Sequence, residues 1–164
     1  MEGARPARPD DLEACARLLD EARTRAEVLR GGPDLLAERG LPPSPLDERW
    51  LAERCAGARP GDEGRRAGAL FVGTIDDVVV GIAAGRVTTR GGERIGVIDC
   101  CYVETGARNV GVGTTLAESL IGWFAGAGCV AVDAPALPGD RATKQLFESQ
   151  GLSARLLVLH RRLP

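Results

Sequence analysis

The sequence predicts an α+β fold in a single domain spanning residues 1–164, and three observations carry the prediction. A chain of 164 residues can form one hydrophobic core that removes about two thirds of its unfolded surface from water. Helical periodicity near the N-terminus is followed by three consecutive β-forming runs, and the second half alternates between helical and β patterns. A meander followed by a β-α-β element is typical of α+β domains.

The N-terminal part predicts a short strand and two helices. The strand lies near Ala4–Arg8, and the apolar residues after it recur at the 3.6-residue period of a helix that Asp10 or Asp11 caps. The segment Gly31–Pro45 is rich in glycine and proline, so we expect a connection with one helical turn. A second amphipathic helix is predicted over Leu46–Ala56.

The middle of the chain predicts three strands, at Ala69–Ile75, Val78–Val87 and Arg94–Glu104. Asp76 and Asp77 lie between the first two and are typical of a tight hairpin turn. A glycine-containing turn separates the second strand from the third. Three consecutive strands with short connections predict an antiparallel meander.

The second half alternates between the two kinds of element. Helices are predicted at Val112–Ala127 and Asp140–Gln150, and strands at Cys129–Ala134 and Ala154–Arg161. No internal repeat and no low-complexity linker interrupts this order.

Composition excludes several classes of function. The formal net charge is −2, and arginines and acidic residues are interspersed along the chain, so nucleic acid is not an expected partner. No apolar run approaches the roughly 18 residues of a membrane span, and the N-terminus lacks the apolar core of a secretion signal. We therefore expect a cytoplasmic protein without a membrane partner.

The cysteines and the single histidine exclude two kinds of site. The five cysteines are odd in number and show no C-x-x-C spacing, and His160 is the only histidine. We therefore expect neither a disulfide framework nor a metal site.

A glycine-containing turn before the helix at Val112 predicts an anion site. The first N–H groups of a helix lack partners within it, and the helix dipole places partial positive charge there. Gly111 and Gly113 leave the backbone open to an oxygen-rich group such as pyrophosphate, and Arg108 adds a positive charge. The alternative is that the glycines only close a strand-to-helix turn. The turn lacks the third glycine of the dinucleotide fingerprint and the lysine of the ATPase phosphate loop.

Two motifs and the order of the elements resemble the GCN5-related N-acetyltransferase (GNAT) family. The segment Arg108–Gly113 is similar to the Q/R-x-x-G-x-G/A motif that binds acetyl-CoA in that family. The later segment Asp140–Leu152, "DRATKQLFESQGL", is similar to the family's N-x-x-A-x-x-L-Y-E-x-x-G-F segment. The resemblance covers nearly the whole chain.

The resemblance implies a mixed, mostly antiparallel sheet flanked by helices, with a splayed central strand pair. The pantetheine arm of acetyl-CoA, the co-substrate, would lie in the wedge between these strands and pair with backbone groups. The pyrophosphate would lie on the N-terminus of the following helix. The residues that the resemblance assigns to the coenzyme are Cys101, Tyr102, Val103, Arg108, Asn109, Val110, Gly111, Val112, Gly113, Thr114 and Asp140.

Asp99 is the candidate catalytic residue, because a carboxylate within an apolar β run requires a reason. In the family, a carboxylate on this strand often accepts the proton of the amine. The alternative is a structural Asp99 that an arginine such as Arg86 satisfies. Phe147 occupies the position of the family's usual tyrosine acid, and Tyr102 lies on the opposite face from Asp99 unless a bulge interrupts the strand.

The predicted function is transfer of an acetyl group from acetyl-CoA directly to a primary amine of a small molecule or a protein N-terminus. A covalent route through Cys100 or Cys101 is disfavoured, because no histidine lies nearby in the motif region to activate a thiolate. The alternative function is a non-catalytic acyl-CoA-binding sensor or assembly module. The amine acceptor is not identified by the sequence, and a homodimer is compatible with it.

Overall fold

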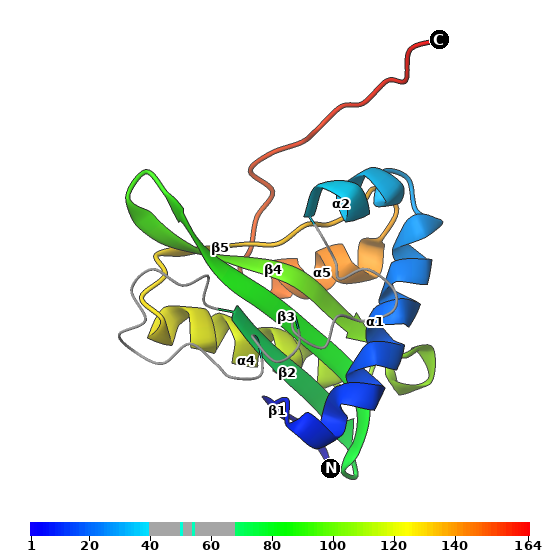
Figure 1. Ribbon diagram of the computed structural model, residues 1–164, viewed down its shortest axis with the longest axis vertical. Helices are drawn as coiled ribbons and strands as arrows, with labels where there is room; N and C mark the ends of the chain where they lie inside the picture. The colour runs from blue at the N-terminus through cyan, green and yellow to red at the C-terminus, as the bar shows by residue number, and fades with distance from the viewer. Residues whose placement is uncertain (40–49, 51–53, 55–67) are drawn as a thin grey trace.

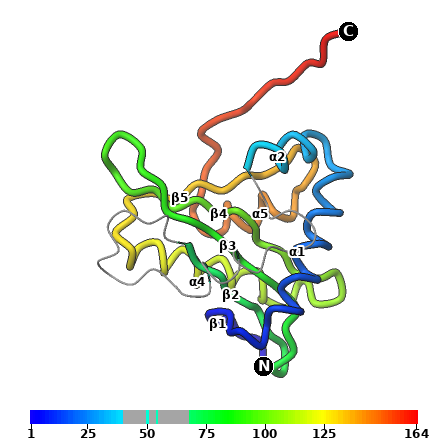
Figure 2. The backbone as a smooth tube through the Cα atoms, viewed as in Figure 1, coloured from blue at the N-terminus to red at the C-terminus, as the bar shows by residue number. Residues whose placement is uncertain are grey.

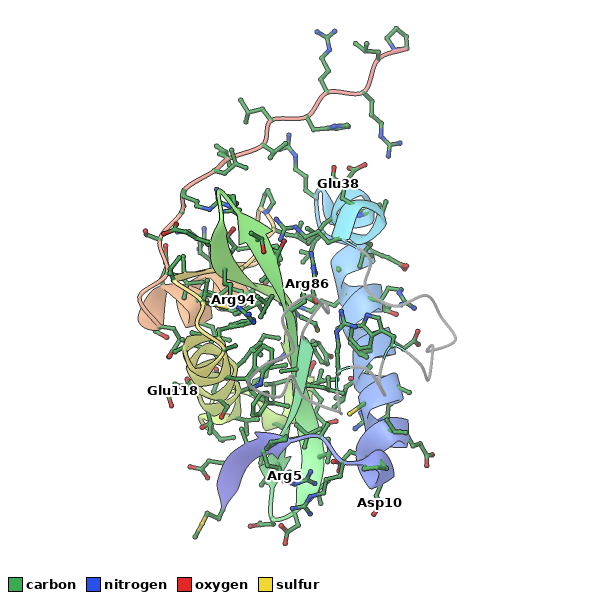
Figure 3. The ribbon with its side chains drawn as sticks, turned by 60° about the vertical axis from the view of Figure 1, so that its left-hand side comes forward. Arg5, Asp10, Glu38, Arg86, Arg94 and Glu118 are labelled. Atoms are coloured by element: carbon green, nitrogen blue, oxygen red, sulfur yellow. The ribbon has the colours of Figure 1, made fainter. Side chains whose placement is uncertain are left out.

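A five-stranded sheet in the order β1-β2-β3-β4-β5 separates two helical layers (Figures 1 and 3). The structure is a computed structural model that describes residues 1–39, Trp50, Arg54 and 68–164. The strands are β1 (Glu2–Pro6), β2 (Gly68–Ile75), β3 (Val78–Arg90), β4 (Glu93–Val103) and β5 (Ala131–Asp133). The helices are α1 (Leu12–Glu27), α2 (Gly32–Arg39), α4 (Val112–Gly126) and α5 (Arg141–Ser149), with 3₁₀ turns η1 (Pro9–Asp11) and η2 (Thr105–Ala107).

This architecture confirms the predicted α+β fold with its meander. β2, β3 and β4 pair antiparallel in chain order, and only the pairing of β4 with β5 is parallel. Asp76 and Asp77 turn the chain between β2 and β3 with φ of 46° and 66°, the left-handed conformation of a tight hairpin turn. Gly91 and Gly92 follow β3 with φ of 60° and 84°. β3 therefore continues through residues 88–90, where the sequence predicted a turn.

Each face of the sheet carries its own hydrophobic core. Leu18 of α1 packs with Ile82 on one face, and Leu120 and Phe124 of α4 pack with Ile98 on the other. α5 lies on the same side of the sheet as α4 (Figure 3).

Two glycines allow α4 to lie close against the sheet. A Cβ atom at Gly96 would lie 2.5 Å from a ring carbon of Phe124, and one at Gly85 would lie 2.6 Å from another. Phe124 is fully buried, so its ring has no free space to move into. The same close approach brings the first turn of α4 beside the end of β4, where a Cβ at Gly113 would lie 3.7 Å from a methyl carbon of Val103.

β4 is irregular at Asp99. Two consecutive residues of β3 pair with Ile98 and Cys100, so Asp99 is the extra residue of a β-bulge. Ile98 packs in the core beneath α4, whereas Cys100 and Tyr102 pack in the core beneath α1. The bulge therefore changes the alternation of side chains along the last third of the strand.

β4 and β5 separate after three paired positions. Ile95–Val97 pairs with Ala131–Asp133, and β5 then ends while β4 continues to Val103. Within the described ranges, the edge of residues 98–103 that faces away from β3 has no strand partner. This confirms the predicted splayed pair, although the strand predicted over Cys129–Ala134 is shorter at both ends.

The N-terminal helices differ in part from the predictions. The connection predicted over Gly31–Pro45 contains α2, a helix of eight residues, in place of one turn. The helix predicted over Leu46–Ala56 lies outside the described residues, apart from Trp50 and Arg54.

The predicted cap of α1 by an aspartate side chain is wrong. Asp11 is the N-cap residue, but its side chain makes no capping hydrogen bond to α1. Its carboxylate instead accepts hydrogen bonds from the guanidinium of Arg5 at 2.6 and 2.9 Å and from the backbone N–H of Arg8 at 2.7 Å. The Arg5 hydrogen bond lowers the pKa of Asp11, and the pair fastens β1 to the start of α1.

The last predicted strand, Ala154–Arg161, is also wrong. The chain after Gly151 has no regular secondary structure, and it extends away from the sheet (Figure 1). His160 is exposed there rather than held in a sheet. The physical reason is that a strand needs a neighbour for its backbone hydrogen bonds, and no described strand lies beside this segment.

Candidate active site between β4 and β5

A pocket opens where β4 and β5 separate. β4, α1 and the chain that leads from β5 into α5 line it together. Its lining includes Arg25, Asp99, Tyr102, Asp140 and Phe147. The strand separation therefore brings the end of β4 and the later motif, which begins at Asp140, into one cavity.

The start of α4 presents free backbone donors. Gly111 is the N-cap residue with φ of 96°, a conformation that strongly favours glycine. Its carbonyl accepts the hydrogen bond of the Thr115 N–H at 3.0 Å, and so begins the helix. No hydrogen bond within the described residues engages the N–H groups of Val112, Gly113 or Thr114. Such a helix start can hold an anion by its backbone and dipole.

Arg108 connects this helix start to the end of β4. Its Nε donates a hydrogen bond of 2.8 Å to the carbonyl of Val103, and its guanidinium carbon lies 5.5 Å from the centre of the Tyr102 ring. Its positive charge is therefore held at the end of β4. Asn109 follows with φ of 65°. The structure thus places the predicted segments 101–103 and 108–114 next to each other.

Asp99 lies in the bulge, and its side chain is only 3% exposed. It forms ion pairs with Arg86 and with Arg54, the latter at 3.4 Å. Figure 3 shows Arg86 on the side of the sheet that faces α1. The structural alternative for Asp99, an ion pair with an arginine such as Arg86, is therefore present in the structure. Asp99 also lines the pocket, so its catalytic role stays a prediction.

Tyr102 shares the α1 side of the sheet with Asp99 because of the bulge. In a regular strand the two side chains would lie on opposite faces, as the sequence predicts in the absence of a bulge. The Tyr102 hydroxyl donates a hydrogen bond of 3.1 Å to Oε2 of Glu21. Burial, and then this carboxylate, raise the pKa of Tyr102, so the phenol stays protonated at neutral pH.

Asp140 and Phe147 border the pocket from α5. The Asp140 side chain caps the helix, since it accepts hydrogen bonds from the N–H of Thr143 at 3.4 Å and from its hydroxyl at 2.7 Å. Arg25 of α1 contacts the same carboxylate at 3.3 Å. Phe147 is 5% exposed and brings no proton donor. The predicted contact of Asp140 with the coenzyme stays a prediction.

The adjacent cysteines Cys100 and Cys101 are not activated for nucleophilic attack. Burial raises the pKa of Cys100 to about 12 and that of Cys101 to about 12. Both thiols are therefore protonated at neutral pH, and a thiol is a poor nucleophile compared with its thiolate. This supports their role as small apolar residues.

A polar stripe on α1 was missed by sequence reasoning. Arg17, Glu21 and Arg25 recur at a spacing of four residues, so they share one face of the helix. They reach across to the site elements: Arg17 pairs with Glu104 at 2.9 Å, Glu21 accepts from Tyr102, and Arg25 pairs with Asp140. The charged i, i+4, i+8 pattern indicates a polar helix face. The partners of these residues lie more than 80 residues away in the chain, so the pattern does not identify them.

Among the described residues, no helix is long and apolar enough to cross a membrane. No group of three or more side chains of the kinds that bind metal ions comes together in this part of the chain.

The sequence matches one family model. The model of the acetyltransferase (GNAT) family matches residues 34–152, which include both motifs and the bulged strand. A search of curated proteins found no match.

Solved structures share the fold along nearly the whole chain. A transcriptional regulator from Bacillus halodurans C-125 superposes with a TM-score of 0.66 at 20% identity, covering 99% of this chain and 100% of the other. An aminoglycoside acetyltransferase from an uncultured soil metagenomic sample, in complex with sisomicin, gives a TM-score of 0.63 at 16% identity and 99% and 95% coverage. An acetyltransferase from Trypanosoma brucei gives 0.62 at 21% identity and 99% and 100% coverage.

These superpositions show a common fold. At such low sequence identity they do not identify a substrate. The family match rests on the sequence itself and covers most of the chain. The splayed strands and the open helix start lie within that match. The chain belongs to the GNAT family of acetyltransferases.

Proposed function

We propose that this protein is an N-acetyltransferase that moves the acetyl group of acetyl-CoA directly to a primary amine. The main support is the open edge of β4, which ends next to the first turn of α4 with its free N–H groups, and Arg108, which is hydrogen-bonded to the end of β4. Backbone groups of Cys101–Val103 would hydrogen-bond the amides of the pantetheine arm as an added strand does. The N–H groups of Val112–Thr114 would bind the pyrophosphate.

The acceptor amine would approach from the α1 side of the pocket. An alkylamine has a pKa of about 10, so it must lose a proton before it attacks the thioester. Asp99 would accept that proton, directly or through water, because it is the carboxylate of β4 that lines the pocket. Arg86 and Arg54 would hold its carboxylate in place.

The leaving thiolate needs a proton when the thioester breaks. Phe147 cannot supply one, and the pKa of a free alkyl thiol is about 8.5, so water or the proton lost by the amine suffices. The acceptor class stays within primary amines of small molecules or protein N-termini. The aminoglycoside acetyltransferase of the same fold was solved with sisomicin, which supports including aminoglycosides in a screen.

The experiment that tests this function is release of the coenzyme A thiol in the presence of a panel of amines. Acetyl-CoA binding, measured by thermal shift, is done first because it isolates the coenzyme site. We expect a stabilising shift and amine-dependent thiol release. Binding with no release across aminoglycosides, polyamines, amino acids and N-terminal peptides would contradict the catalytic proposal.

That contrary outcome corresponds to the second candidate, a non-catalytic acyl-CoA-binding module. Two observations favour it: Phe147 replaces the family's tyrosine, and two arginines already engage Asp99. Such a module would keep the coenzyme cleft and act as a sensor or assembly partner, with no turnover.

Val110→Asp is expected to weaken acetyl-CoA binding at least about tenfold without loss of stability. Val110 is 49% exposed and immediately precedes Gly111. A carboxylate there would repel the pyrophosphate, while it would interact favourably with the helix dipole by about 0.3–1 kcal/mol. Isothermal titration gives the affinity, and thermal unfolding gives the stability.

Val110→Asn is the matched control, because asparagine has nearly the same shape as aspartate and carries no charge. We expect its affinity to stay close to that of the native protein. Equal affinities for all three proteins would place the diphosphate elsewhere than at the start of α4.

A further inference from the structure

The last residues of the chain carry apolar surface that no described residue covers. Figures 1 and 2 show this segment running away from the sheet and the helices. Leu156, Leu157, Val158 and Leu159 are 72%, 78%, 77% and 86% exposed. Four consecutive large apolar side chains in water are unfavourable, and such a patch typically marks an interaction site.

The apolar residues of this segment suit an interior strand. In extended backbone Leu156 and Val158 lie on one face, and Leu157 and Leu159 lie on the other. A strand with water on one face alternates between apolar and polar residues, whereas a strand that is apolar on both faces is covered on both. The segment therefore requires a sheet neighbour and cover on each side.

β5 offers an open edge of matching character. It pairs with β4 on one side, and no described strand pairs with its other side. Val130, immediately before it, is 62% exposed. An edge strand presents unpaired N–H and C=O groups, which are a template for an added strand.

The base of the segment is fixed next to this edge. Arg155 donates to both oxygens of Asp133, from Nε at 2.8 Å and from Nη2 at 2.5 Å, and Arg90 contacts the same carboxylate at 2.5 Å. Arg155, and then Arg90, lower the pKa of Asp133 to about 2. The carboxylate is therefore ionised, and the ion pair present, at every pH at which the protein is normally handled. Beyond this anchor the apolar run points outward, away from its own β5 (Figure 2).

We propose that residues 156–161 of each copy add as a strand to the open β5 edge of a second copy, in a symmetric homodimer. The contact is isologous: each copy gives its C-terminal segment and receives the segment of the other. A second copy is the chosen partner because it presents an open apolar-flanked edge and a segment to exchange, so both exposed features are satisfied at once. This inference does not depend on the proposed enzymatic function.

Sedimentation velocity of the full chain, with two proline variants, tests the proposal. Neighbouring residues of a strand direct their N–H groups to opposite edges, so we use Val158→Pro and Leu159→Pro. Proline removes one N–H group and fixes φ, and at least one of the two variants should weaken the dimer by at least about tenfold. Leu163→Pro, outside the proposed strand, is the control and should remain dimeric. All variants should keep the native circular dichroism spectrum.

Hydrogen exchange distinguishes a second copy from the chain's own edge. Amides of residues 156–161 should be protected in the dimer and should lose protection on dilution, in step with dissociation. Three results would overturn the proposal: a monomeric full chain, protection that is independent of dilution, or a dimer that both proline variants leave unchanged.

Discussion

Gly96→Ala should destabilise the protein by about 1–3 kcal/mol, the usual cost of adding a carbon to a filled core. The new Cβ would lie 2.5–2.7 Å from three ring carbons of Phe124, which is fully buried. Either the ring leaves its rotamer or α4 moves away from the sheet. At about 2–4 °C per kcal/mol for a chain of this size, the melting temperature should fall by roughly 2–12 °C. Thermal unfolding followed by circular dichroism measures it.

Gly122→Ala makes the same chemical change where space is free. Gly122 is exposed within α4, and a Cβ there would meet nothing within 4 Å. Alanine favours a helix over glycine by about 1 kcal/mol, so this variant should melt higher than the native protein. If the melting temperatures of both variants changed equally, the packing of Phe124 against the sheet would not require a glycine at position 96. If Gly96→Ala moves α4, it should also weaken acetyl-CoA binding.

Asp99→Asn should lower turnover with amines at least about tenfold if Asp99 is the general base, since positioned proton transfer contributes about 10²–10⁴ in rate. It should also destabilise the protein by about 1–3 kcal/mol, because the buried side chain loses the charge that attracts two guanidinium groups. Turnover must therefore be measured well below the melting temperature of the variant. Steady-state kinetics with the best amine of the screen gives the result.

Arg86→Gln separates the two roles of Asp99. It removes the arginine of the ion pair and keeps the carboxylate, which Arg54 still contacts, so it should cost comparable stability with a smaller loss of turnover. If both variants lose turnover equally, or if neither does, Asp99 is a structural residue and the proton acceptor lies elsewhere.

The sequence predicted the scaffold and the glycine-containing turn before α4 well, because both depend on local patterns. The motif from Arg108 to Gly113 requires only a strand end, two glycines and a helix start, all adjacent in the chain. Asp76 and Asp77 likewise determine their turn by themselves. The cap of α1 is an exception among the local features, because the Asp11 carboxylate binds Arg5 and the Arg8 N–H instead.

The α1 side of the pocket could not be predicted, because it is built from contacts between distant segments. The bulge at Asp99 is a property of strand register, and an isolated run of apolar residues does not reveal it. It decides which face Tyr102 occupies, and so whether Glu21 can be its partner. The last strand was predicted from a sound β pattern, but a pattern does not say whether a neighbouring strand is available.

The polar stripe on α1 reaches the pocket lining at Arg25. The side chains of Arg17, Glu21 and Arg25 are 47%, 38% and 39% exposed, so water and salt reach each of their charge pairs. Exposed pairs contribute about 0–1 kcal/mol each. Of the three, Arg25 is the residue whose side chain can leave its carboxylate partner and change the lining of the pocket at a cost of this order, while the apolar face of α1 stays packed.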